Sequence, residues 1–202
     1  MKKVVLAAVA AAAMAATSPL AHAQIKIGVI NSLSGPFSAF GKRYQTGMEV
    51  ALKEVNANGG INGQELQLIV QDDRSEAQSA LAAVESLVNQ NVPLIIGSYA
   101  SSITGPMAQL MTRQKVPLIV LGSADDSITR PGSQWVFRAK HTSTIVARTY
   151  FDYFDYLRKR GGPELKTVAM LYGNGAWPTS LAEAGKKYAK ERGYEVVGDQ
   201  SY

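Results

Sequence analysis

Cysteine is absent from this 202-residue chain, and histidine occurs only at His22 and His141. Without thiols, the chain can form neither a disulfide nor a thiolate metal site. Once the N-terminal 23 residues are set aside, a zinc site or a histidine-dependent catalytic triad would depend on His141 alone. The composition therefore leaves little material for metal or histidine chemistry.

The sequence also lacks the glycine motifs that bind nucleotides. Gly35, Gly41 and Lys42 are faintly similar to a phosphate loop, but the spacing of the glycines is too long, and Arg43 stands where a Ser or Thr is required. No Gly-x-Gly-x-x-Gly opens a predicted helix, and the Gly-x-Ser-x-Gly elbow of hydrolases is missing. We therefore expect no metal, no cofactor and no enzymatic activity.

A large excess of one charge is missing as well. The formal net charge is +5, and it falls to +3 when Lys2 and Lys3 of the N-terminal leader are removed. So small and dispersed an excess does not indicate a nucleic-acid partner. No segment after the leader reaches the ~20 consecutive apolar residues of a transmembrane helix.

The N-terminus has the three-part pattern of a signal peptide. Lys2 and Lys3 precede the apolar run VVLAAVAAAAMAA, and residues 21–23, Ala-His-Ala, match the small-x-small pattern of a cleavage site. Pro19 interrupts the apolar stretch before it is long enough to span a membrane. The sequence predicts a signal peptide over residues 1–23, cleaved after Ala23, and export to the periplasm.

Short β-branched runs alternate with longer helical segments from Gln24 onwards. This alternation predicts an α/β fold with doubly wound, mostly parallel sheets. Several of the predicted strands are apolar throughout, as strands buried on both faces should be. The predicted strands are 25–30, 65–70, 93–96, 117–121, 135–138, 167–172 and 194–197.

Apolar residues recur at helical spacing between these strands. A third helix is predicted from about 104 to 114 and a fourth from about 142 to 159. The fourth carries an aromatic stripe, which at this spacing indicates packing in a core or between lobes. Only two strands follow it, too few for a sheet covered on both faces, so we expect the sequence to be the N-terminal portion of a longer protein.

Three polar loops directly follow predicted strands: SLSGPFSAFG (32–41), GSYASSITG (97–105) and GSADDS (122–127). In an open parallel sheet, ligands bind outside the carboxyl ends of the strands, where such loops lead into helices. The three loops are therefore expected to form one binding site.

Acidic residues occur as two adjacent pairs, Asp72 with Asp73 and Asp125 with Asp126. Adjacent side chains on one backbone usually diverge, so a paired catalytic role does not follow from the pattern. At strand-to-helix turns such residues are typical helix caps, and we expect that role here.

The loop over 97–105 is rich in hydroxyl groups. A carboxylate at a helix N-terminus can accept hydrogen bonds from free backbone amides and from hydroxyls, and the helix dipole favours its charge. Capping the helix needs one hydroxyl, whereas Ser98, Ser101, Ser102 and Thr104 offer four. The surplus favours carboxylate binding by Ser101, Ser102 and Thr104, with N-capping as the alternative.

These loops, the turn NANGGINGQ and the strand end DD resemble the periplasmic branched-chain amino-acid-binding proteins of ABC importers, the leucine-binding-protein type. The resemblance extends from Gln24 to Tyr202. It implies a type I periplasmic-binding fold, in which two α/β lobes joined by hinge crossings close on a ligand. By this resemblance, residues 24–140 form the N-terminal lobe, and 141–202 begin a second lobe that is incomplete in this chain.

The resemblance also implies roles for individual residues. Ser101 matches the serine that holds the ligand carboxylate in this family. Gly122 and Ala124 match the two positions that contact the ligand ammonium. Phe40 and Trp177 match aromatic positions, one from each lobe.

Ala124 departs from the family pattern because it has no hydroxyl. The ammonium contact is lost unless Ser123 or Asp125 replaces it. The ligand class therefore stays open between an amino acid, branched-chain or related, an aromatic or aliphatic carboxylic acid, and an amide. Two large rings could hold a flat or apolar group.

Two functions follow from this reading. The first is the periplasmic solute-binding component of an ABC importer, which captures a small carboxylate by hinge closure and presents it to an inner-membrane permease. The second is the exported ligand-sensing domain of a receptor or signalling system. A secreted enzyme would need a nucleophile or general base that the sequence does not offer. We expect a monomer without a nucleic-acid partner.

Overall fold

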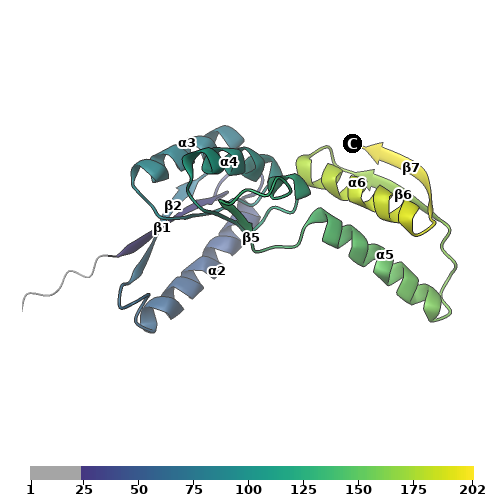
Figure 1. Cartoon of the computed structure of the whole chain (residues 1–202), viewed down its shortest axis with the longest axis horizontal. Helices are drawn as coiled ribbons and strands as arrows, with labels where there is room; N and C mark the ends of the chain where they lie inside the picture. The colour runs from purple at the N-terminus through teal and green to yellow at the C-terminus, as the bar shows by residue number, and fades with distance from the viewer. Residues whose placement is uncertain (1–23) are drawn as a thin grey trace, which may run out of the picture.

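The computed structural model describes residues 24–202, so the predicted signal peptide lies outside the described residues. In this part of the chain seven strands alternate with helices (Figure 1). Each strand overlaps a predicted one, and the predicted α/β class is confirmed. The strands are β1 (Ile25–Asn31), β2 (Leu66–Asp72), β3 (Ile95–Gly97), β4 (Leu118–Val120), β5 (Val136–Arg138), β6 (Thr167–Tyr172) and β7 (Glu195–Ser201).

The helices are α2 (Ser38–Ala57), α3 (Ala77–Asn89), α4 (Ser101–Gln114), α5 (Ser143–Lys159) and α6 (Ala176–Glu191), with a 3-10 turn η1 (Asp126–Ile128). The predicted start of the third helix near Thr104 is wrong, because α4 begins at Ser101. The Ala100 carbonyl accepts hydrogen bonds from the amides of Ile103 and Thr104, at 3.1 and 2.9 Å, so Ser101 opens the first turn. This shift decides which side chains face the site.

The first five strands form one sheet in the order β2-β1-β3-β4-β5, and every neighbouring pair is parallel. The strand order reverses beside β1, which is where ligands bind in such sheets. Figure 1 shows α3 and α4 on one face of the sheet and α2 on the other. The core lies between α3, α4 and the sheet, where Val84, Leu87, Ile95, Met107 and Leu118 are fully buried.

Strands β6 and β7 form a separate parallel sheet that packs on α6, and α6 packs on α5. The core of this part is a small cluster around Phe151, Ala189 and Tyr194. Residues of β6 alternate between exposed and half-buried, and Leu171 is 73% exposed. This strand pair is thus covered on one side only, where the helices lie (Figure 1), as the expectation of too few strands for a sheet covered on both faces implies.

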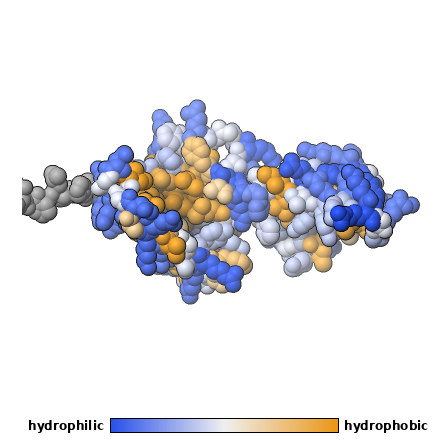
Figure 2. Space-filling model, turned by 90° about the horizontal axis from the view of Figure 1, so that it is seen from below, coloured by the Kyte–Doolittle hydropathy of each residue, from blue (hydrophilic) through white to orange (hydrophobic). Residues whose placement is uncertain are grey.

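The aromatic stripe of α5 is only partly packed. Phe151 is buried and contacts Phe154 edge-on and Tyr188 of α6. Tyr150 and Tyr153 are 55% and 56% exposed, so neither packs in a core within the described residues, and packing between lobes stays a prediction for them. The helix turns the side of Phe151 toward α6 and leaves the tyrosines at the surface. Figure 2 shows hydrophobic residues at the surface of both parts, with the larger area over the five-stranded part.

Candidate functional site

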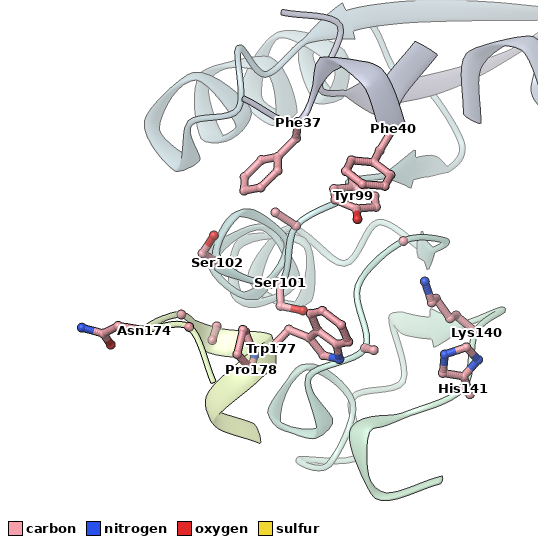
Figure 3. Close-up of a pocket in the computed structure, with 16 residues that line it drawn as sticks. Phe37, Phe40, Tyr99, Ser101, Ser102, Lys140, His141, Asn174, Trp177 and Pro178 are labelled. Atoms are coloured by element: carbon pink, nitrogen blue, oxygen red, sulfur yellow. The ribbon is translucent and has the colours of Figure 1, made fainter. Parts of the chain in front are cut away.

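A cavity of about 360 Å³ opens between the carboxyl ends of the first sheet and the start of α6. Its wall is drawn in Figure 3 and comes from five segments of the chain. These segments are the start of α2, residues 99–102 after β3, the loop after β4, residues 140–141 after β5, and residues 173–178. The volume is in the range of small-molecule sites.

Most of the predicted site residues meet in this cavity. Ser101 and Ser102 come from the first turn of α4, and Trp177 comes from the first turn of α6. The predicted residues that line the cavity are Phe40, Ser101, Ser102, Gly122, Ala124 and Trp177. The strand order brings together loops that lie far apart in the sequence.

Thr104 and Ser123 lie behind the wall, and this corrects their predicted place in the site. Both are buried, and the Ser123 hydroxyl donates to Thr104 Oγ1 at 2.6 Å. Thr104 Oγ1 also accepts from the backbone amide of Ser98 at 3.2 Å. Because α4 starts at Ser101, the side chain of its fourth residue turns inward. The two hydroxyls join the loops after β3 and β4 and do not face the cavity.

The hydroxyl of Ser101 has a free proton at the cavity wall. Its oxygen accepts a hydrogen bond from the Asp125 amide at 3.2 Å, and among residues 24–202 no acceptor takes its proton. The residue is 7% exposed, so a group that binds there is largely shielded from water. The hydroxyl can therefore donate to an anionic oxygen.

The N-termini of α4 and α6 both lie at the cavity. Helix α4 follows a strand of the five-stranded sheet, and α6 follows a strand of the two-stranded sheet. Neither has a side-chain cap, and the backbone amides of Ser101, Ser102, Ala176 and Trp177 have no acceptor within residues 24–202. Free amides and the positive ends of two helix dipoles favour an anion between them. The capping alternative for the hydroxyls of α4 is therefore wrong, since no hydroxyl caps this helix.

Gly122 allows the loops after β3 and β4 to touch. A Cβ atom at this position would lie 2.6 Å from the Tyr99 Cα and 2.8 Å from the Tyr99 carbonyl oxygen. Next along the loop, the Ala124 carbonyl accepts hydrogen bonds from the amide and the hydroxyl of Ser143, at the start of α5. This loop therefore connects the binding wall to the second part of the molecule.

Three aromatic rings pack at one side of the cavity (Figure 3). Phe40 and Tyr99 are stacked with ring centroids 4.5 Å apart and planes 7° apart, and Phe37 tilts against Tyr99 at 5.7 Å. Sequence reasoning missed Phe37 and Tyr99, although each lies within one of the three polar loops. Both loops mix aromatic with hydroxyl residues, and this pattern could have identified the two rings from the sequence. Together with Trp177, these rings make the site largely apolar.

Two basic side chains, Lys140 and His141, line the same cavity and were also missed. No lining residue within the described range is acidic. Burial raises the pKa of Tyr99, and the neighbouring Tyr44 raises it further, so its hydroxyl stays protonated at neutral pH. The described wall therefore offers positive charge and hydrogen-bond donors.

The predicted capping role of the paired acids is confirmed for Asp125, which caps η1, and is wrong for Asp72, because α3 has no side-chain cap. Asp72 accepts hydrogen bonds from the amides of Leu33 and Ser34 and from the Ser34 hydroxyl. Burial raises the pKa of Asp72, but these bonds, together with one from the Arg74 amide, lower it more, and the net shift is downward. Asp72 thus holds the loop after β1 against the end of β2.

Asp125 and Asp126 have similar roles after β4. Asp125 caps η1 by accepting from the Ser127 amide, and Asp126 accepts from the amide and hydroxyl of Thr144 in the first turn of α5. The Arg138 guanidinium donates to the carbonyls of Ser123 and Asp125. These contacts fix the loop after β4 against β5 and α5.

Two further observations concern residues 24–202 as a whole. No helix in this range is long and apolar enough to cross a membrane. No group of three His, Cys, Asp or Glu side chains in this range is placed to hold a metal ion.

Comparison with known proteins places this site in a family context. The sequence profile of the family described as "Periplasmic binding protein" matches residues 24–202. The Leu/Ile/Val-binding protein homolog 7 of Brucella abortus (strain 2308) is 31% identical over 209 residues, which cover all of this chain and 51% of the relative. The chain thus spans about half the length of the curated relatives it matches.

Two solved structures of substrate-binding proteins are also similar to this chain, again over about half of their length. An ABC transporter substrate-binding protein from Desulfitobacterium hafniense, in complex with Leu, is 26% identical with a TM-score of 0.75, covering 89% of this chain and 51% of that one. The branched-chain amino acid transporter substrate binding protein LivJ from Streptococcus pneumoniae, in complex with isoleucine, is 26% identical with a TM-score of 0.71, covering 89% and 50%.

Proposed function

The chain belongs to the periplasmic binding protein family, and we propose that it is the solute-binding component of an ABC importer. We further propose that it captures a small carboxylate, an amino acid or a related acid, between its two α/β parts. The Brucella relative carries a Leu/Ile/Val-binding name, and the two solved neighbours are described as complexes with leucine and isoleucine. These relatives support an acid with an apolar side chain as the ligand.

The observation that carries this proposal is the Ser101 hydroxyl at the meeting point of two uncapped helix N-termini. Its oxygen is already used as an acceptor from Asp125, so the hydroxyl is oriented as a donor toward the cavity. The free amides of Ser101 and Ser102 can add further donors to the same anion. The remaining predicted site residues, Phe40, Gly122, Ala124 and Trp177, supply apolar surface and a backbone wall.

Closure of the two parts around the ligand is the proposed mechanism. The cavity wall includes α4 from the first part and α6 from the second, so a bound anion would contact both. A ligand with contacts on both parts favours the closed arrangement over the open one, because only closure makes all the contacts. The Asp126 amide donates to Ser180 of α6 at 3.3 Å, a contact that the same closure would govern. No bond in the ligand is made or broken.

Residues 1–23 complete the proposal as a cleaved signal peptide that directs export to the periplasm. Residues 24–140 and 141–202 are proposed as the two lobe segments, with the boundary after β5. The permease of the importer would recognise and bind the closed state.

Replacing the proposed anion donor tests the function. Ser101→Ala should weaken binding of leucine or benzoate by about 1–3 kcal/mol, because a buried carboxylate loses a hydrogen-bond donor. Isothermal calorimetry or an NMR titration measures this loss. Ser79→Ala, in the first turn of α3 and away from the cavity, is the matched control and should change nothing. Equal affinity in wild type and Ser101→Ala would show that Ser101 is not a ligand contact.

A further inference from the structure

A side cavity of about 360 Å³ adjoins the site and shares Phe40, Tyr99 and Lys140 with it. Arg43 and Tyr44 of α2 form the rest of its wall. Two of these wall residues are cations, and none is acidic. The binding site thus continues past the aromatic stack into a region of positive charge.

Neither cation of the side cavity is neutralised within residues 24–202. The ion pairs found in that range use other basic residues and leave out both Arg43 and Lys140. Lys140 is half-buried, so its charge is less screened than that of a fully exposed lysine. An anionic group in the side cavity would meet both charges without displacing an existing partner.

Two tyrosine hydroxyls add neutral donors to the same region. The rings of Tyr44 and Tyr99 lie 6.0 Å apart. Figure 3 shows the Tyr99 hydroxyl pointing into the cavity on the side of Lys140. Because the pKa of Tyr99 is raised by burial, its hydroxyl remains a donor at neutral pH.

An α-ammonium group, by contrast, has no anionic partner in the described wall. The lining residues include no acid, and Ala124 offers a methyl group at the position where the family resemblance implies a hydroxyl. Lys140 would add positive charge close to the ammonium. Like charges in one site are unfavourable, so Lys140 disfavours an ammonium group beside it.

The surface between the two donor regions is flat and apolar. Tyr99 stacks on Phe40 and lies between the α4 serines and the side cavity, with Trp177 across the main cavity (Figure 3). Aromatic side chains favour stacked or edge-on contact with another ring. A planar ligand fits this surface better than a branched aliphatic one.

We propose that the ligand is a flat aromatic acid with two anionic groups. One carboxylate binds the hydroxyls and amides of Ser101 and Ser102, and the second group binds Lys140 and Arg43 in the side cavity. The ring lies against Tyr99. This inference rests on the proposed function, because it assigns the second end of the same ligand.

Titration of the full chain with a set of probes tests the inference. The probes are benzoate, the three benzenedicarboxylates and leucine, followed by NMR so that weak binding is measured. At least one benzenedicarboxylate should bind about tenfold more tightly than benzoate, because its second carboxylate gains charge-assisted hydrogen bonds. That gain should shrink as salt is added, since part of it is electrostatic and exposed to solvent.

Lys140→Met should reduce the affinity for the best dicarboxylate about tenfold, and affect benzoate much less, because benzoate has no second anion. Lys42→Met removes the same charge from the exposed side of α2, outside both cavities, and should leave every affinity unchanged.

The experiment distinguishes failure of this inference from failure of the proposed function. If benzoate binds and no dicarboxylate exceeds it, or if leucine binds more tightly than all of them, the inference is overturned and the proposed function stands. If Lys140→Met and Lys42→Met act alike, the side cavity is not the second anion site. If none of the five probes binds, the proposed function fails together with the inference.

Discussion

The five-stranded part and the two-stranded part of this molecule differ in how their apolar residues are covered. In the first, α3 and α4 bury a continuous cluster that includes Leu87, Ile95 and Met107. In the second, the buried cluster is centred on Phe151 and Tyr194, while Leu171 and Tyr150 stay exposed. Buried apolar area is the main source of folding stability. We therefore expect the first part to be the rigid wall of the site and the second part to be the more easily opened one.

Core truncation gives the largest expected effect. Leu87→Ala should lower the free energy of unfolding by about 2–5 kcal/mol, because the residue is fully buried and its neighbours cannot fill the space. Phe151→Ala should cost less than about 3 kcal/mol, the lower end for such a change, because its partners Phe154 and Tyr188 are only partly buried. Urea denaturation measures both. A larger loss for Phe151→Ala would reverse the comparison between the two parts.

The next effect concerns the wall between the loops after β3 and β4. Gly122→Ala places a methyl group against the Tyr99 backbone and should destabilise the protein by about 1–3 kcal/mol through overpacking. Gly47→Ala is the matched control, since nothing lies within 4 Å of a Cβ there and the site is within α2. It should stabilise by about 0.5–1 kcal/mol because alanine favours helix. Thermal unfolding of the two variants in parallel shows whether Gly122 is needed for close packing.

The smallest effect is a pH dependence of the contact between α5 and the end of α6. Hydrogen bonding from Arg192 lowers the pKa of Asp155, and burial opposes this shift without reversing it. A lowered folded-state pKa means that the stabilisation is present above the ordinary value of about 4 and is lost as the pH falls through the folded-state value. The hydrogen-exchange protection factors of α5 and α6, taken relative to the intrinsic exchange rate at each pH, should therefore fall below about pH 4, before those of α3 and α4.

Arg192→Met should abolish much of this difference between the two parts. Lys187→Met, which removes an exposed cation from α6, should not. Acid-induced opening of both parts at the same pH in the wild type would contradict a separate, weaker second part.

The sequence predicted the strands and the place of the site well, because parallel strands and strand-end loops leave local signals. The sequence indicated Ser101 by its hydroxyl-rich loop, but Phe40 and Trp177 only through the family resemblance; all three line the cavity, although Trp177 lies 76 positions from Ser101 in the chain. It failed for Thr104 and Ser123, because a shift of three residues in the start of α4 turns a side chain from the cavity to the interior. The start of α4 has no capping side chain, so the sequence carries no local signal that marks its first residue.

It also missed Tyr99, Lys140 and His141, whose place depends on packing between loops. The Phe40–Tyr99 stack joins residues from two segments, and a local pattern cannot show which rings will meet. The exposure of Tyr150 on α5 has a similar cause: periodicity identifies an apolar face, but only the arrangement of neighbours decides whether it is covered.

The central claim is that an anion binds where the N-termini of α4 and α6 meet at Ser101. The most direct test is a backbone-amide NMR titration of the full chain with benzoate. The amide signals of Ser101, Ser102 and Trp177 should shift together and saturate at one affinity, while the amide of Gln78, in the first turn of α3, should not move. Shifts of equal size at Gln78, or no shift at Ser101 and Ser102, would contradict the claim.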